Sequence, residues 1–287
     1  MDIPFSKMHG LGNCYIYIDT LSHSMDWPDF PELSRRVSDS HTGMGSDGLI
    51  VIGQPEHPEA DIQMRIFNKD GSEAKNCGNG LRCVAKYAYE RHLLDQRTFV
   101  IETLGGLVEA SVHVDDNRSV GQVTINMGHP QLERRDIPMS GDNVPHVIGE
   151  AFVLNQQVWP LTAVSMGNPH AIFFVDDIQK APVELMGRLL ADGHERFPEG
   201  VNVGFVEKNA NHELNYVVWE RGSGRTQACG TGACAATVAA VLNKHVSRGQ
   251  PVTVHLEGGD LSIEWAENKD VLMTGAAEWI CDGRFHY

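Results

Sequence analysis

Short runs in which every second residue is apolar recur along this chain of 287 residues. Two of them, 62–66 and 214–218, have apolar residues at alternate positions, the period of a strand with one buried face. Further short apolar or alternating runs are GLIVIG (48–53), LVEASVHV (107–114), QVTINM (122–127) and VTVHLEGGDLSIEW (252–265). Together they predict a strand-rich α+β protein.

One pattern occurs twice. Segment 61–83 aligns without gaps on segment 213–235, at an offset of 152 residues (229 − 77). Each copy holds an alternating apolar run, turn-forming residues, a Cys-Gly-x-Gly sequence, and then apolar residues at i, i+3, i+4 and i+7, which mark one face of a helix. Each copy therefore predicts strand, turn, thiol and helix. The first helix should end within 92–95 and the second before 247.

The repeat predicts a duplicated domain. LGN at 11–13 and MGNPH at 166–170 stand at similar distances before the two copies, which supports duplication. We expect an N-terminal half, 1–128, that carries Cys77 and a C-terminal half, 129–274, that carries Cys229. The alternative is a chance coincidence of common supersecondary motifs.

Cys77 and Cys229 fall where the two predicted helices begin. Free N–H groups and the positive end of the helix dipole stabilise an anion at such a position. A thiol placed there is expected to have its pKa lowered from about 8.5 toward neutrality. The same N–H groups can hold a carboxylate, so we expect a small acidic ligand.

Other interpretations of the cysteines remain open. Buried cysteines often only pack, and four of the six could form a zinc site: Cys77, Cys83, Cys229 and Cys234. Their spacings, C-x5-C and C-x4-C, exceed those typical of structural zinc. Cys83 and Cys234 also fall one position apart in the repeat, which favours packing roles for both. A redox role would favour C-x-x-C, which does not occur.

The sequence GMGSDG (43–48) matches the glycine pattern of dinucleotide-binding loops. Such loops require a helix after the glycines, whereas the apolar run that follows here predicts a strand. We therefore interpret the segment as a glycine-rich turn that lines the site.

Composition narrows the function classes. Lys and Arg total 23 against 38 Asp and Glu, for a formal charge of −15, which disfavours nucleic-acid and membrane-surface partners. The 41% of apolar residues allows a sizeable core, and no apolar run is long enough to cross a bilayer. The N-terminus lacks the features of a secretory signal, so we expect reduced thiols and a cytoplasmic protein.

Two opposed thiols suit the inversion of a stereocentre. If both face one cleft, a thiolate can remove the α-hydrogen of an amino acid while a thiol delivers a proton to the opposite face. The two helix N-termini would stabilise the charge that develops on the carboxylate. Pyridoxal phosphate is then not needed as an electron sink, and we expect neither cofactor nor metal.

Seven motifs, in order along the chain, resemble those of the diaminopimelate epimerases: HGLGN (9–13), GMGSDG (43–48), FNKDGSEAKNCGNGLRC (67–83), MGNPHA (166–171), FPEGVNVGFVE (197–207), WERGSGRTQACGTGACA (219–235) and TGAAEWICDG (274–283). The resemblance implies a cofactor-independent interconversion of LL- and meso-diaminopimelate for lysine and peptidoglycan precursor synthesis. It implies two pseudo-symmetric domains, each a β-barrel-like sheet around a central helix, with the active site in the cleft between them. Residues 275–287 would return to the first domain, and the enzyme would be a homodimer.

The resemblance also implies roles for individual residues. Cys77 and Cys229 would be the two acid/bases, and His170 and Glu220 would lie near them and tune their protonation. The amino-diacid substrate would be bound by side chains and first-turn backbone amides of Asn13, Asn68, Gly78, Asn79, Asn168, Asn202, Arg221, Gly230 and Thr231.

The sequence departs from the family pattern at three positions. Cys14 stands where the family often has Asp, Gly48 where some members have Gln, and Arg225 where Glu is usual. The nearest alternative is another cofactor-independent racemase, such as a proline racemase-like enzyme; phenazine-pathway relatives of the family lack the cysteine pair. From a different class, the alternative is a zinc-stabilised interaction module.

Overall fold

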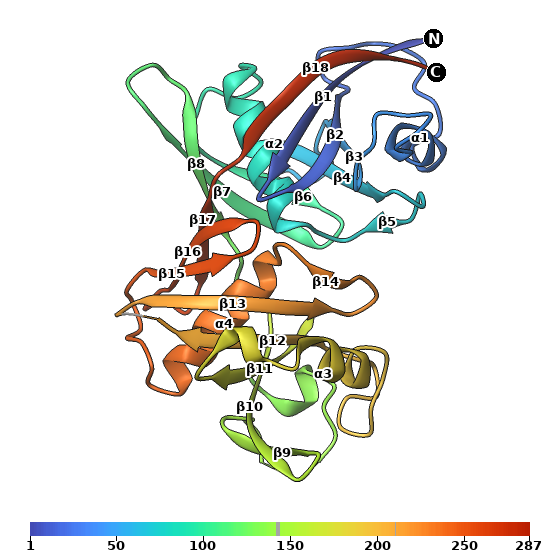
Figure 1. Cartoon of the computed structure of the whole chain (residues 1–287). Helices are drawn as coiled ribbons and strands as arrows, with labels where there is room; N and C mark the ends of the chain where they lie inside the picture. The colour runs from blue at the N-terminus through green and yellow to red at the C-terminus, as the bar shows by residue number, and fades with distance from the viewer. Residues whose placement is uncertain (142–143, 210) are drawn as a thin grey trace. The chain divides into compact units, whose positions relative to one another are not determined.

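The computed structural model describes residues 1–141, 144–209 and 211–287. The chain divides into two compact units: unit 1 is Met1–Asn126 with Thr274–Tyr287, and unit 2 is Met127–Met273. Both are rich in strands (Figure 1), so the predicted sheet-dominated α+β class is confirmed. None of the helices in the described residues is long and apolar enough to cross a membrane.

Unit 1 surrounds one buried helix, α2, with strands. Its elements are β1 (Asp2–Gly10), β2 (Asn13–Asp19), α1 (Phe30–Ser38), β3 (Gly48–Gly53), β4 (Ile62–Asn68), β5 (Glu73–Ala74), α2 (Gly78–Glu90), β6 (Thr98–Thr103), β7 (Gly106–Val114), β8 (Val120–Asn126) and β18 (Glu278–His286). β1 pairs antiparallel with both β2 and β18. The order continues with β2–β3 parallel, β3–β4 antiparallel, β4–β6 parallel and β6–β7–β8 antiparallel.

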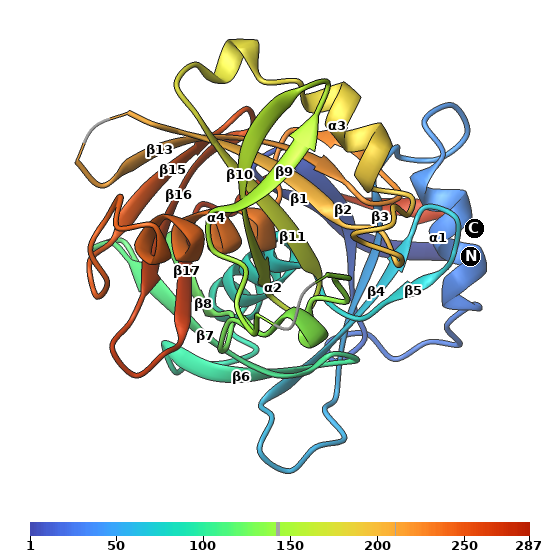
Figure 2. The same ribbon diagram turned by 90° about the horizontal axis from the view of Figure 1, so that it is seen from below.

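Unit 2 is built in the same way around α4. Its elements are η1 (Arg134–Asp136), β9 (Glu150–Leu154), β10 (Gln157–Ser165), β11 (Pro169–Val175), η2 (Ile178–Lys180), α3 (Val183–Leu190), β12 (Asn202–Lys208), β13 (Glu213–Glu220), β14 (Gly224–Thr226), α4 (Gly230–Leu242), β15 (Val252–Leu256) and β16 (Gly259–Trp265). The chain returns to unit 1 through β17 (Val271–Gly275). In unit 2, α4 contacts β10 to β13, β15 and β16. Figure 2 shows β10, β11, β13, β15 and β16 around it.

The pairings repeat between the units. The run β11–β12–β13–β15 has the parallel, antiparallel, parallel order of β2–β3–β4–β6. Both ends of α4 lie 152 residues after those of α2 (230 − 78 and 242 − 90). The predicted repeat of strand, turn, thiol and helix is therefore confirmed, as is the strand, β3, that follows the glycines of 43–48.

Both central helices end in the same way. His92 and Lys244, again 152 residues apart (244 − 92), adopt left-handed conformations with φ of 58° and 61°. The amide of the next residue then bonds back to a carbonyl in the last turn, Leu93 to Ala88 and His245 to Ala240. This is the Schellman arrangement, which satisfies carbonyls that the helix leaves open. It ends the first helix slightly before the predicted range.

Burial explains why these helices are central. In α2 every residue from Asn79 to Tyr89 is buried, and in α4 Gly230 and the run from Gly232 to Ala240 are buried. Small residues dominate α4, so strands can approach it on all sides. Each helix is thereby held rigidly along its length, and its N-terminus has a fixed position within its unit.

Candidate active site

Cys77 caps the N-terminus of α2. Its backbone is extended (φ −152°, ψ 110°), and its Sγ accepts a hydrogen bond from the Gly80 amide at 3.4 Å. A Cβ at Gly80 would lie 2.7 Å from Ile50 Cδ1 on β3, so any larger residue here would require the Ile50 side chain to shift. The Cys-Gly-x-Gly pattern thus seats the helix start against the sheet and turns the sulfur toward the first-turn amides.

Asn13, at the start of β2, faces the same sulfur. Its Oδ1 accepts from the Cys77 thiol at 3.5 Å and from Asn79 Nδ2 at 3.4 Å. Its Nδ2 donates to Asp47 Oδ2 at 2.8 Å, which fixes the orientation of the amide. Asp47 also accepts from the Cys14 amide at 2.8 Å, so the 43–48 turn contributes to the site through Asp47.

Arg82 and Tyr15 support this cluster and are absent from the predicted site. Arg82 is fully buried; it donates to Asn79 Oδ1 at 2.9 Å and to the Ala276 carbonyl at 3.1 Å. Tyr15 is buried, and burial, followed by the charges of Cys77 and Asp47, raises the pKa of its hydroxyl far above the ordinary range. Both carried a signal in the sequence: Arg82 is a charge within an apolar helix, and Tyr15 shares a strand face with Asn13.

Asn68 and Gly48 are partners in the β3–β4 register. Asn68 Nδ2 donates to Ser72 Oγ at 3.0 Å, so its side chain closes the turn after β4 in this structure. A Cβ at Gly48 would lie 2.1 Å from the Phe67 carbonyl and 3.0 Å from Tyr15 Cε1. Gly48 therefore has no room for a side chain, which explains the departure from Gln.

Cys229 occupies the N-cap position of α4 in unit 2, but its side chain, unlike that of Cys77, makes no capping hydrogen bond. It is 4% exposed, with an extended backbone (φ −123°, ψ 105°), and its Sγ lies 3.5 Å from Thr231 Oγ1. Glu220, at the end of β13, interacts with the thiol through its carboxylate. The Thr226 hydroxyl donates a hydrogen bond to that carboxylate and so orients it.

His170 extends the cluster in unit 2. The ring is completely buried, and its Nε2 lies 3.1 Å from Asn168 Oδ1 and 3.2 Å from Thr231 Oγ1. Thr231 thus contacts both His170 and Cys229. His170 pairs in register with Asn202 across the parallel strands β11 and β12.

Asn202 and Arg221 form the other side of the unit 2 cluster. Asn202 donates to the Pro169 carbonyl at 3.1 Å and accepts from the Arg221 amide at 2.8 Å. Arg221 also donates from its guanidinium to the Glu199 carbonyl at 2.8 Å. These bonds tie the segment before β12 to the turn after β13.

The expectation of lowered thiol pKa values is wrong for this structure. Burial raises the pKa of Cys77, although the amides of Gly80 and Asn79 act in the opposite direction. Burial and, next, the negative charge of Glu220 raise the pKa of Cys229 well above its ordinary value. The loss of hydration outweighs the helix N-terminus in both cases.

Burial also keeps His170 uncharged. It lowers the pKa of the ring to about 3, with a smaller contribution from the positive charge of Arg221. At neutral pH the ring is therefore a neutral imidazole, and in this form its Nε2 hydrogen-bonds with Asn168 and Thr231.

The remaining cysteines have other surroundings. Cys83 and Cys234 are buried within the helices, and neither forms a disulfide. Within residues 1–141, 144–209 and 211–287, no group of three or more His, Cys, Asp or Glu side chains is arranged to hold a metal ion.

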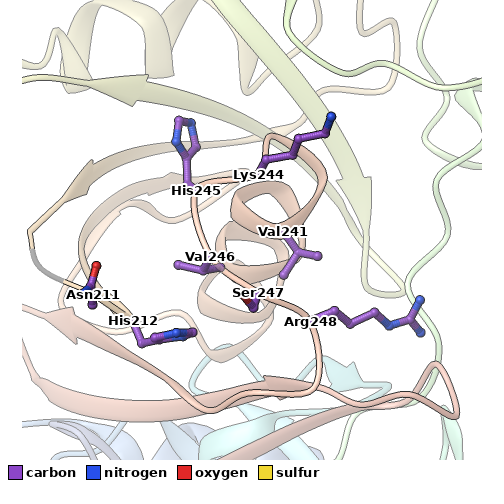
Figure 3. A pocket seen from close by; sticks show the side chains of 8 residues that line it. All are labelled: Asn211, His212, Val241, Lys244, His245, Val246, Ser247 and Arg248. Atoms are coloured by element: carbon purple, nitrogen blue, oxygen red, sulfur yellow. The ribbon is translucent and has the colours of Figure 1, made fainter.

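A pocket of about 370 Å³ lies at the C-terminal end of α4 (Figure 3). None of the predicted site residues line it; the lining residues are Asn211, His212, Val241, Lys244, His245, Val246, Ser247 and Arg248. The side chains of Lys244, His245 and Arg248 point in different directions in Figure 3. Arg248 donates to the Ala266 carbonyl at 3.0 Å. These three side chains therefore do not converge on a ligand.

Comparisons with known proteins identify the family. A family model described as diaminopimelate epimerase matches residues 5–133 and 162–280. The chain is 56% identical over 289 residues to a diaminopimelate epimerase of Oceanobacillus iheyensis, which covers 100% of this chain and 99% of the relative. The chain belongs to the diaminopimelate epimerase family. The predicted family and its reaction class, an isomerase, are thereby confirmed.

Other diaminopimelate epimerases are as similar. That of Geobacillus kaustophilus is 57% identical over 283 residues, which covers 99% of this chain and 96% of the relative. Among solved structures, a PhzF-family phenazine biosynthesis protein of Bacillus anthracis has a TM-score of 0.70 at 16% identity, with 100% of both chains covered. A probable proline racemase of Agrobacterium radiobacter has a TM-score of 0.69 at 17% identity, covering 99% of this chain and 92% of the other. These two show the fold.

Proposed function

We propose that the protein interconverts LL- and meso-diaminopimelate without a cofactor, with Cys77 and Cys229 as the two acid/bases. The observation that carries the proposal is the pair of cysteines at equivalent helix N-caps in a member of this family. One sulfur, as thiolate, takes the α-proton, and the electron pair of the broken C–H bond moves into the carboxylate. The other, as thiol, gives its proton to the opposite face. No net oxidation occurs, and the thiol and thiolate exchange roles.

The surroundings of the two thiols differ, although burial raises the pKa of both. At Cys77 the amides of Gly80 and Asn79 partly offset the effect of burial on the pKa. Cys229 lies beside the Glu220 carboxylate, which favours the protonated thiol. A substrate that brings positive charge near Cys77 would lower the pKa of that thiol and so favour its ionisation. The mechanism requires both sulfurs to reach the same α-carbon during the reaction.

Binding of the amino-diacid follows from the same two clusters. We propose that first-turn amides of α2 and α4 hold the reacting carboxylate, because free N–H groups at a helix start bind anions. These amides belong to Gly78, Asn79, Gly230 and Thr231. The side chains proposed to contact the substrate are Asn13, Asn68, Asn168, Asn202 and Arg221. The positive charge of Arg221 is the one suited to a carboxylate.

Assembly and pathway belong to the same proposal. We propose that units 1 and 2 are the two duplicated domains, which is supported by the division of the chain after Asn126 and Met273. The enzyme would act as a cytoplasmic homodimer in lysine and peptidoglycan precursor synthesis. Light scattering of the purified protein tests the dimer, and a monomeric mass would overturn it.

Isotope exchange tests the chemistry. Purified protein incubated with LL-diaminopimelate in D₂O should place deuterium at the α-carbon as the meso isomer appears. Cys77→Ala and Cys229→Ala should each abolish epimerisation, whereas Cys281→Ala, which removes an exposed thiol, should retain it. Near wild-type epimerisation in either of the first two variants would refute the two-base mechanism.

A further inference from the structure

We propose that Arg82 and Asp47 are positioning residues that fix which atom of the Asn13 amide faces the Cys77 sulfur. They stand at the two ends of a hydrogen-bonded chain that runs through the side chains of Asn79 and Asn13, all within unit 1. This amide chain presents the Asn13 oxygen to the thiol and so favours protonated Cys77 until substrate binds. The inference rests on the proposed function of Cys77.

The three hydrogen bonds of the amide chain all run in one direction. Arg82 Nη2 donates to Asn79 Oδ1 at 2.9 Å. Asn79 Nδ2 then donates to Asn13 Oδ1 at 3.4 Å, and Asn13 Nδ2 donates to Asp47 Oδ2 at 2.8 Å. Each amide therefore directs its oxygen toward the Arg82 end and its nitrogen toward the Asp47 end.

The chemistry of the two ends fixes this direction. A guanidinium only donates hydrogen bonds, so Asn79 has to turn its oxygen toward Arg82. A carboxylate only accepts them, so Asn13 has to turn its nitrogen toward Asp47. Rotation of either amide by half a turn would leave donor facing donor or acceptor facing acceptor, which costs the hydrogen bond and its desolvation. The two charges thus determine the orientation of both amides.

Packing holds the Arg82 end of the chain in place. The Arg82 side chain is fully buried, and its Nε donates to the Ala276 carbonyl at 3.1 Å. Gly10, at the end of β1, leaves the room that this arrangement needs. A Cβ at Gly10 would lie 3.0 Å from Arg82 Nη2 and 3.1 Å from the Asn79 carbonyl oxygen.

The Asp47 end depends on a single carboxylate oxygen. Oδ2 accepts from Asn13 Nδ2 and from the Cys14 amide, each at 2.8 Å. The backbone of Asp47 is held separately, because its amide donates to the Cys14 carbonyl at 2.8 Å and its carbonyl accepts from the Lys69 amide at 3.1 Å. The exposed side chain can therefore be changed while the turn keeps these backbone bonds.

The orientation of Asn13 has a consequence for Cys77. The thiol donates to Asn13 Oδ1 at 3.5 Å. A hydrogen bond made only by the protonated form stabilises the thiol relative to the thiolate. Because the acceptor is a neutral amide, it opposes ionisation less strongly than a carboxylate would. Positive charge from a bound substrate can then overcome it.

The charged and titratable groups around Cys77 come from three elements. They are Arg82 and Cys83 on α2, Tyr15 and Tyr17 on β2, and Asp47 on the 43–48 turn. The charge of Arg82 favours the thiolate, whereas a negative charge on Asp47 opposes it. A test of Asp47 must therefore separate its charge from its hydrogen bond to Asn13.

Two substitutions at position 47 of the full-length protein make this separation. Asp47→Asn removes the charge but keeps an oxygen for the Cys14 amide and for Asn13 Nδ2, whereas Asp47→Ala removes both. Alkylation of Cys77 by iodoacetamide, followed against pH by mass spectrometry of its peptide, reports the pKa of the thiol.

We expect the pKa of Cys77 to be about one unit lower in Asp47→Ala than in Asp47→Asn. Alkylation at a fixed pH below the pKa is then about tenfold faster in Asp47→Ala. The reason is that the released Asn13 turns its nitrogen to the sulfur or gives way to water, and either one donates to the thiolate.

The same two substitutions in an Asn13→Ala background are the matched control. There the pKa of Cys77 should be equal in both, because Asp47 acts on the thiol through Asn13. Equal pKa values with Asn13 present would overturn the proposal, and so would a difference that persists without Asn13. If Asp47→Ala does not fold, Asp47→Ser, whose shorter side chain also withdraws the acceptor, takes its place in the comparison. Alkylation needs no turnover, so absence of deuterium exchange in the wild type refutes the proposed function separately.

Discussion

Acidification should destabilise the folded protein through one buried side chain, that of His170. The ring is completely buried, and its pKa is lowered from 6.5 to about 3, chiefly by burial. Below pH 6.5 the unfolded chain therefore binds a proton that the folded chain excludes. The resulting stability is fully present above pH 6.5 and is lost as the pH falls toward 3.

The size of the effect follows from the two pKa values. Each pKa unit corresponds to about 1.4 kcal/mol, so the contribution of His170 to the free energy of unfolding should fall by roughly 2.5 kcal/mol from pH 7.5 to 4.5. His170→Gln lacks this titration. The difference in stability between wild type and variant should therefore shrink by that amount over the same pH interval.

Urea unfolding followed by tryptophan fluorescence, at pH values from 7.5 to 4.5, measures this difference. The carboxylates titrate in both proteins, so their contributions to the pH dependence cancel in the difference. Hydrogen bonds that the substitution removes change the size of the difference but not its variation with pH. His23→Gln, which removes an exposed histidine, is the matched control and should follow the wild type at every pH. A stability difference between wild type and His170→Gln that stays constant with pH would refute the buried, neutral imidazole.

Three further substitutions test the packing of the two helices. Gly232→Ala should lower the free energy of unfolding in urea by about 1–3 kcal/mol, because its Cβ would lie 2.3 Å from the Tyr216 hydroxyl. Adding Tyr216→Phe should recover most of this loss of stability, and no recovery would contradict the clash. Arg82→Met should lower the free energy of unfolding, measured by thermal unfolding, by at least about 3 kcal/mol, because it leaves buried acceptors without their donor. A loss of stability under about 1 kcal/mol would contradict this. Burial raises the pKa of Cys83 to about 11, so stability should fall as the pH rises above 9, and Cys83→Ala should reduce that alkaline loss; an unchanged alkaline loss would contradict this.

The sequence predicts an element well where a strand buries one face or where a Cys-Gly-x-Gly motif marks the start of a helix. The apolar alternation of 62–66 and 214–218 predicts β4 and β13, and Cys-Gly-x-Gly predicts where α2 and α4 begin. Pattern succeeds here because burial of one strand face is a local property.

The thiol environments were not predictable in the same way. The sequence places Cys77 and Cys229 at helix N-termini, and from that position alone a lowered pKa follows. Their burial depends on strands that are distant in the chain, and it reverses the direction for both. The role of Arg82 was not predicted for the same reason, since only the packed structure shows that its buried guanidinium donates to Asn79.

Duplication accounts for the matched positions of the two cysteines but not for their different chemistry. The backbone repeats at a constant offset, including caps and terminating residues, so each sulfur is seated at the same point of an equivalent helix. The side chains that face the sulfurs differ: Asn13 at Cys77, and Thr231 together with the Glu220 carboxylate at Cys229. The carboxylate opposes ionisation of Cys229 alone. Since a two-base epimerisation needs one base and one acid at the same moment, divergence of these neighbours supplies what a perfectly symmetric duplication would lack.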